Sequence, residues 1–207
     1  MKIAGIYLAA GQSKRMGCSK LSIELEPNRR LGGIALERAL QSSLDHIVIV
    51  TRREEGVEWL PTTLKKVEGR RLRSIHCLDA DKGMAHSLRS GLQKACEQEV
   101  PEAVVVMLAD QPFITASMID GLIQSFMKRP QLDYCAVGCM GAPRPPVLIA
   151  RSMFEAVGQL EGDEGARALF FLPHYSGMVI EEDEHYRFLD ADTPEELERV
   201  RFYYLKG

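Results

Sequence analysis

Two kinds of hydrophobic pattern alternate along the chain. Short apolar runs of strand length recur between segments whose apolar residues repeat at three- and four-residue spacing. The clearest run, 103–108, is wholly apolar and rich in valine, as in a central strand covered on both faces. The clearest helical segment is 83–98, where Met84, Leu88 and Leu92 lie on one face. This alternation predicts an α/β protein with a mostly parallel sheet.

Weaker patterns extend this alternation over the rest of the chain. Strands are expected at 2–10, 46–51, 73–78, 134–140 and 147–150, and helices at 31–43, 152–160 and 165–171. A proline-rich turn is expected between the last two of these strands. Thr115 is expected to cap a helix that ends near Lys128, and Thr193 to cap a last helix with Pro194 at its first position. Because no linker is visible, we expect one domain over residues 1–207.

Composition limits the kinds of partner. The 207 residues are 45% hydrophobic and 27% charged, with a net charge of −3. This balance is typical of an ordinary globular protein and excludes a broad surface for nucleic acid. No apolar stretch reaches the length of a membrane span, and no secretory signal is recognised. The five cysteines are odd in number and irregularly spaced, so we expect a reduced, cytoplasmic chain.

The first strand-like run leads into a loop rich in glycine and serine, residues 11–20. Small residues at 9–11 let backbone amides approach an anion closely, and Arg15 and Lys20 add positive charge. Ligands of open α/β sheets bind beyond the carboxyl ends of the strands. The loop is therefore predicted to hold a polyphosphate, although it is neither a Walker A loop nor a G-x-G-x-x-G loop. The alternative is a solvated loop with incidental basic residues.

Two acidic positions are candidates for a metal site. Asp110 directly follows the most buried strand, and Asp192 lies in a late acidic segment beside Asp190. Mg²⁺ prefers one or two carboxylates together with phosphate oxygens and water. The alternatives are that Asp110 is a turn or cap residue, and that Asp190 and Asp192 only cap the last helix.

Five motifs, in order, resemble those of the molybdenum cofactor cytidylyltransferases, within the superfamily of Rossmann-like nucleotidyltransferases. They are Leu-Ala-Ala-Gly-x-Ser-x-Arg-Met-Gly-x-x-Lys at 8–20, Asp-x-x-x-Gly-Met-x-x-Ser-Leu at 79–88, Leu-x-Asp-Gln-Pro at 108–112, Gly-Asp-x-Gly-Ala-Arg at 162–167 and Asp-x-Asp-Thr-Pro-Glu at 190–195. The resemblance implies a Rossmann-like three-layer α/β/α fold. It also implies that the N-terminal half binds the nucleotide and the C-terminal half binds the acceptor.

The same resemblance assigns roles to individual residues. It implies phosphate contacts and catalytic roles for Arg15 and Lys20, and makes Asp110 and Asp192 the ligands of Mg²⁺, with Asp110 catalytic. The implied nucleotide contacts, besides Arg15 and Lys20, are Leu8, Ala9, Ala10, Gly11, Asp79, Gly83 and Ser87. The implied acceptor contacts are Arg144, Asp163 and Arg167.

Two positions bear on the choice of substrates. Guanylyltransferase relatives carry glycine where this chain has Ala10, which favours CTP over GTP. At 141–147 many relatives have Gly-x-x-Gly-His-Pro-Val, whereas this chain has Arg144-Pro145-Pro146 in the middle of the segment. This departure leaves the acceptor open.

The leading hypothesis is a Mg²⁺-dependent transfer of CMP from CTP to a molybdopterin-type cofactor, with release of pyrophosphate. Such a step belongs to the maturation of a molybdenum hydroxylase such as xanthine dehydrogenase, and hence to purine catabolism. The alternatives are a cytidylyltransferase for a sugar or isoprenoid phosphate, and a non-catalytic partner that inserts the cofactor into the hydroxylase. Neither nucleic acid nor a membrane is expected as a partner.

Overall fold

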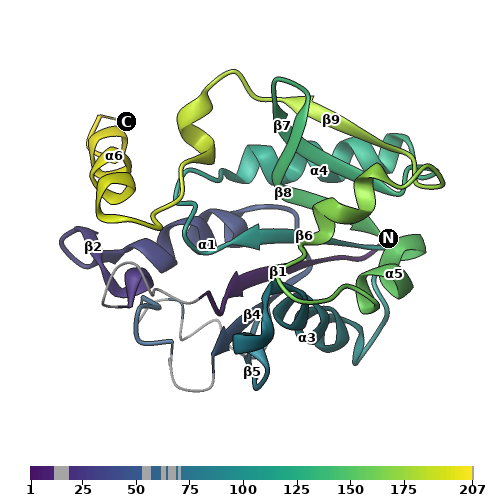
Figure 1. Cartoon of the computed structure of the whole chain (residues 1–207), viewed down its shortest axis with the longest axis horizontal. Coiled ribbons are helices and arrows are strands. Elements are labelled where there is room, and N and C mark those ends of the chain that lie inside the picture. Colours follow the sequence, from purple (N-terminus) through teal and green to yellow (C-terminus); the bar gives the residue numbers. More distant parts are fainter. Residues whose placement is uncertain (12–18, 53–56, 62–63, 65–68, 70, 207) are drawn as a thin grey trace.

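A twisted central sheet forms the middle of the molecule (Figure 1). The computed structural model describes residues 1–11, 19–52, 57–61, 64, 69 and 71–206. Within them the sheet has seven strands in the order β5-β4-β1-β6-β8-β7-β9. The strands are β1 Ile3–Ala9, β4 His46–Arg52, β5 Leu72–Cys77, β6 Ala103–Leu108, β7 Tyr134–Cys139, β8 Ala142–Ala150 and β9 Gly177–Glu181. β8 runs antiparallel to both of its neighbours, and the other pairs are parallel.

Helices cover both faces of this sheet. They are α1 Leu31–Gln41, α3 Met84–Cys96, α4 Ala116–Lys128 and α5 Phe154–Gly158, and a last helix, α6 Pro194–Tyr204, lies apart from the sheet (Figure 1). Along β1, Tyr7 packs into the cluster that contains α1 and α4, whereas Ile6 packs into the cluster that contains α3 and α5. This alternation is the two-residue period of a strand buried on both faces. The arrangement confirms the predicted three-layer α/β/α fold with a mostly parallel sheet.

A third, smaller core joins the two ends of the chain. The hairpin β2 (Glu24–Glu26) and β3 (Arg29–Arg30) precedes α1. Leu25, Leu31 and Ile34 from this region pack against Leu197 and Val200 of α6. The C-terminal helix is thereby anchored beside the N-terminal half, which brings the acidic segment before α6 close to β1 and β6.

Short 3-10 helices complete the connections. They are η1 Lys20–Ser22, η2 Ala80–Lys82, η3 Arg151–Met153, η4 Ala166–Phe171 and η5 His185–Phe188. The helix expected at 165–171 is thus a 3-10 helix. The predicted cap at Thr115 is confirmed, because its side chain accepts a hydrogen bond from Met118 N.

The prediction of a proline-rich turn between residues 140 and 147 is wrong. The chain turns instead at Met140 and Gly141, whose φ angles are 52° and 73°, as a two-residue hairpin loop requires. The prolines lie inside β8, where the β7–β8 register shifts between Ala136 and Val137. β6 pairs with β8 only from Val147 onward, so the proline segment is an edge on that side. An edge with a shifted register is where a strand tolerates prolines.

The sequence did not predict β9, because its five residues show no clear alternation of apolar and polar side chains. All five are half-buried or exposed. In the described part of the chain, no helix is both long enough and apolar enough to span a bilayer.

Candidate functional site

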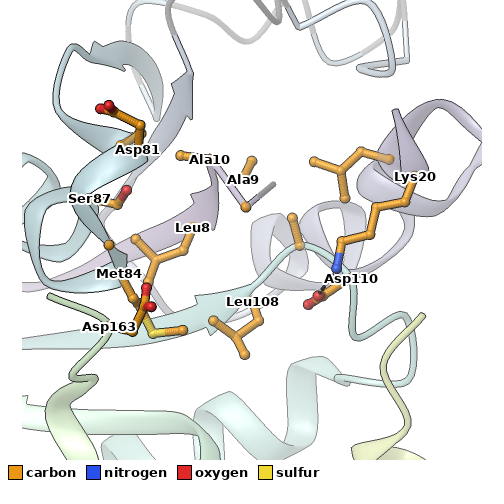
Figure 2. Close-up of a pocket in the computed structure, with 15 residues that line it drawn as sticks. Leu8, Ala9, Ala10, Lys20, Asp81, Met84, Ser87, Leu108, Asp110 and Asp163 are labelled. Carbon is orange, nitrogen blue, oxygen red and sulfur yellow. Dashed lines mark hydrogen bonds and ion pairs between the residues drawn. The ribbon is translucent and has the colours of Figure 1, made fainter. Parts of the chain in front are cut away.

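A cavity of about 370 Å³ opens beyond the carboxyl ends of β1 and β6 (Figure 2). The backbone N–H of Ala109 donates to the carbonyl of Leu8 at 3.0 Å, which holds the two strand ends together at its floor. The residues that line the cavity are Leu8, Ala9, Ala10, Gly11, Lys20, Leu21, Ala80, Asp81, Gly83, Met84, Ser87, Leu108, Ala109, Asp110 and Asp163. This is the place in an open α/β sheet where ligands bind.

The end of β1 forms one wall of the cavity. Leu8, Ala9, Ala10 and Gly11, the predicted nucleoside contacts, all line it. The small side chains of Ala9 and Ala10, and the lack of one at Gly11, leave the backbone within reach of a ligand. Arg15, the predicted phosphate contact in the same loop, lies outside the described residues.

The opposite wall is the start of α3. Gly83 has φ +123°, and a Cβ on it would lie 2.1 Å from the carbonyl oxygen of Gly162. The N–H of Ala85 donates to the same oxygen at 3.0 Å. This close approach of two backbones places Asp163 on the cavity next to Met84 (Figure 2), and the buried Ser87 lines the same wall. A motif predicted for the acceptor therefore shares a cavity with motifs predicted for the nucleotide.

Asp79, a predicted nucleotide contact, lies outside this cavity. Its side chain is 54% exposed and pairs with Lys82 at 2.8 Å. It lines a neighbouring hollow that His86 and Arg89 also line. The charge and hydrogen bond of Lys82 lower the pKa of the Asp79 carboxyl. His86 is partly exposed.

Asp81 lines the cavity instead, from within η2, and sequence reasoning missed it. No local signal in the 79–88 motif distinguishes it from Asp79, two residues earlier. Met84 is a second lining residue that was missed, because its helical spacing with Leu88 suggested a core position.

Two carboxylates from distant parts of the chain meet on one ammonium group. Lys20 Nζ donates to Asp110 Oδ2 at 2.5 Å and also to Asp192 Oδ1. Lys20 is almost completely buried, and Asp110 is largely so. Burial alone would lower the pKa of Lys20, but the charge of Asp110 and the hydrogen bonds to both carboxylates raise it above its ordinary value. The ammonium group therefore stays charged at neutral pH.

These contacts also test whether the site suits a divalent ion. Asp110 and Asp192 reach the same nitrogen, so they can hold one cation between them. Two carboxylate oxygens suit Mg²⁺, which completes its shell with phosphate oxygens and water. Across the described residues, no group of three or more His, Cys, Asp and Glu side chains is arranged to hold a metal ion. Two carboxylates leave further positions of such an ion to phosphate oxygens and water, which fits an ion that arrives with a nucleotide.

Further acidic groups surround this pair. Burial, followed by the charges of Asp110, Asp192 and Glu196, raises the pKa of the Asp190 carboxyl. Glu196 Oε2 accepts from the backbone N–H of Asp192 at 3.1 Å and of Thr193 at 3.0 Å. Asp192 is thereby fixed at the start of α6, with its carboxylate directed to Lys20.

The other predicted acceptor residues lie outside the cavity. Arg144 is exposed on β8, with its guanidinium 5.8 Å from the ring of Phe188. Arg167 is exposed on η4, at 5.8 Å from the ring of Phe171. Both arginines are thus accessible to an anionic or planar ligand, whereas Asp163 alone of the predicted acceptor residues lines the cavity.

Comparison with known proteins agrees with this architecture. Residues 5–177 match the family described as the MobA-like NTP transferase domain. The chain is 36% identical over 202 residues to the purine catabolism protein PucB of Bacillus subtilis (strain 168), with 96% of each covered. It is 29% identical over 216 residues to a probable molybdenum cofactor guanylyltransferase of Natronomonas pharaonis, with 95% of this chain and 96% of that protein covered.

Solved structures show the same fold at lower identity. The crystal structure of Rv0371c from Mycobacterium tuberculosis H37Rv superposes with a TM-score of 0.76 at 21% identity, covering 98% of this chain and 99% of that one. A complex of the same protein with manganese gives a TM-score of 0.74 at 20% identity, with coverage of 98% and 99%. The match over residues 5–177 goes further than the fold: the chain belongs to the MobA-like NTP transferase family and is a nucleotidyltransferase.

Proposed function

We propose that the chain transfers CMP from CTP to a molybdopterin-type cofactor and releases pyrophosphate, with Mg²⁺ held by Asp110 and Asp192. The N-terminal half would bind the nucleotide and the C-terminal half the acceptor, within one domain. The product would serve the maturation of a molybdenum hydroxylase such as xanthine dehydrogenase. The relative in Bacillus subtilis named as a purine catabolism protein supports that destination.

One observation carries the proposal. Asp110, after β6, and Asp192, before α6, both contact the ammonium group of Lys20. This contact lies at the edge of the cavity that is lined by the motifs of the nucleotidyltransferase family. Transfer of a nucleotidyl group brings an anionic acceptor against an anionic phosphate. A bound Mg²⁺ would screen that charge and align the reacting groups.

The reaction requires little further chemistry from the protein. A phosphate oxygen of the acceptor attacks the α-phosphorus of CTP, and the bond to the β,γ-pyrophosphate breaks. No general base is needed, because a phosphate monoester is already ionised near neutral pH. Lys20 would offset charge on the phosphates, and the backbone at Gly11 would lie close to them; we propose the same role for Arg15. Asp163 would face the acceptor from the opposite wall.

The choice of base rests on a single residue. Ala10 lines the cavity where guanylyltransferase relatives have glycine, which supports CTP. The relative in Natronomonas pharaonis is named as a guanylyltransferase, so GTP is the necessary comparison.

A pyrophosphate-release assay tests the proposal. Wild-type protein is incubated with Mg²⁺, a molybdopterin-type cofactor and either CTP or GTP; we expect release with CTP. Asp110→Asn should abolish turnover while circular dichroism remains unchanged. Near-normal turnover in that variant would refute the metal assignment, and release with GTP alone would refute the choice of base.

The acceptor needs its own comparison, because the segment around Arg144 departs from the relatives. The same assay is run with methylerythritol phosphate and with hexose phosphates in place of the cofactor. Faster release with either would favour a cytidylyltransferase for isoprenoid or sugar phosphates. Binding of the cofactor without any pyrophosphate release would favour a role in cofactor insertion.

A further inference from the structure

Lys20 and a divalent metal ion would compete for the same two carboxylates. Lys20 Nζ contacts Asp110 Oδ2 and Asp192 Oδ1, the atoms that the proposed metal site would use. The ammonium nitrogen lies 2.5 Å from Asp110 Oδ2, and Mg²⁺ takes oxygen ligands at about 2.1 Å. An ion bound by these two oxygens would therefore compete with the ammonium group for them.

The surrounding charge explains why a cation is needed there before any substrate binds. Asp190 and Glu196 add negative charge beside Asp110 and Asp192. A buried carboxylate such as that of Asp110 is strongly destabilising without a partner of opposite charge. Lys20, whose side chain is only 7% exposed, supplies the positive charge from within the chain.

The ammonium group of Lys20 also has a second possible partner, the triphosphate of a bound nucleotide. Lys20 lines the same cavity as Gly11, where the triphosphate is proposed to lie. Its backbone is fixed, because the neighbouring Leu21 is buried and the carbonyl of Lys20 accepts from Ile23 N at 3.1 Å. Its four-carbon side chain can nevertheless rotate. Figure 2 shows Lys20 directed to Asp110 along one side of the cavity.

We propose that Lys20 is an exchangeable counter-ion: it holds the metal-binding carboxylates in the free protein and moves to the phosphates when nucleotide binds, which opens the site to the divalent ion. The inference rests on the proposed function for the identity of the metal ligands. It makes Lys20 the residue that couples nucleotide binding to metal binding. Because such coupling is reciprocal, metal must also strengthen nucleotide binding by the same factor.

Mn²⁺ alone is the direct probe. Free Mn²⁺ is measured by its electron paramagnetic resonance signal during titration of wild-type protein and of Lys20→Met, without nucleotide. Lys20→Met keeps the length of the side chain and removes the competing charge, so we expect tighter Mn²⁺ binding, by about tenfold, within the 5- to 150-fold range of typical coupling. Titration in the presence of CTP should strengthen Mn²⁺ binding in the wild type much more than in the variant.

Two controls isolate the effect. Lys94→Met removes an ammonium group that pairs with Glu97 at the far end of α3, and should leave Mn²⁺ affinity unchanged. Lys20→Arg keeps the charge and should bind Mn²⁺ alone as weakly as the wild type. Lys20→Gln is a second neutral variant should Lys20→Met fail to fold.

The outcome separates this inference from the proposed function. An Mn²⁺ affinity in the neutral variants equal to or below that of the wild type, including no binding in either, overturns the counter-ion role. The pyrophosphate-release assay on the wild type does not depend on that result, so nucleotidyl transfer could stand while the exchange fails. Conversely, Mn²⁺ binding without any transfer would refute the proposed reaction and leave the exchange in place.

Discussion

Replacement of Gly83 by alanine tests the junction between the start of α3 and the Gly162–Asp163 segment, on one wall of the cavity. The added Cβ would lie 2.1 Å from the oxygen and 2.2 Å from the carbon of the Gly162 carbonyl, and 2.7 Å from Asp163 N. All three are backbone atoms, so no side-chain rotation relieves the overlap. Restoring an ordinary contact requires the Gly162–Asp163 backbone to retreat by roughly 1.3 Å, which a close-packed interior resists.

Two costs combine in the expected loss of stability. A side chain at φ +123° costs on the order of 1–3 kcal/mol. Forced overpacking costs about 1–3 kcal/mol more. We therefore expect the free energy of unfolding to fall by at least about 2 kcal/mol, which lowers Tm by about 4 °C or more in a chain of this size.

The displacement should also reduce binding, because Asp163 moves away from the cavity. Stability is measured by urea denaturation, and nucleotide binding by the rise in Tm with CTP and Mg²⁺. Gly121→Ala is the matched control: Gly121 lies inside α4 with nothing within 4 Å of its added Cβ, so the same substitution should stabilise by about 0.5–1 kcal/mol. If Gly83→Ala unfolds with the wild-type Tm and responds normally to CTP, the rigid junction inferred here does not exist.

Three further outcomes follow from contacts outside the cavity. Asp133 accepts hydrogen bonds from Ser152 Oγ and from the backbone N–H of Ser176. Burial alone would raise its pKa, but these bonds lower it. The wild type should therefore have a larger free energy of unfolding than Asp133→Ala, and the whole of this difference should be present above the ordinary aspartate pKa of about 4. In urea titrations at lower pH the difference should shrink. Thr193→Ala removes the side-chain cap of α6 and should reduce the free energy of unfolding by about 1 kcal/mol in urea titrations; an unchanged value would contradict the capping role. Burial raises the pKa of the Cys135 thiol to about 11; mass spectrometry should thus find it unalkylated after iodoacetamide treatment of the native protein at pH 8.

The sequence predicted most of the sheet because the relevant forces are local. The run 103–108 contains only apolar residues, so a strand formed by it must be covered on both faces to keep these side chains from water. The same logic failed for residues 142–146, where proline chemistry suggested a turn. The two residues with positive φ at Met140 and Gly141 determine the turn, and one of them is a methionine that carries no turn signal. The register shift that accommodates the prolines is a property of strand pairing, which no local pattern reveals.

The candidate site was predicted in its parts but not in its arrangement. Motif spacing identified Lys20, Asp110 and Asp192 separately. Their contact joins residues separated by 90 and 172 positions, and it depends on the core that anchors α6 beside the N-terminal half. The choice between Asp79 and Asp81 was equally inaccessible. In η2, Asp81 lies at the rim of the cavity and Asp79 pairs with Lys82, and acids two residues apart in a loop show no periodicity from which to choose.

The start of α6 shows how the alternative interpretation of the acidic segment is resolved. Asp190 and Asp192 could have served only as helix caps, but the cap is Thr193, whose hydroxyl accepts from Glu196 N at 3.2 Å. Glu196 completes the capping box and also accepts from the N–H of Asp192. The helix terminus thus satisfies its own backbone without the Asp192 side chain, whose carboxylate contacts Lys20 instead. Because the same glutamate caps the helix and holds the Asp192 backbone, the position of this carboxylate is tied to the stability of α6, so a weakened cap should also weaken the binding of any cation placed between Asp110 and Asp192.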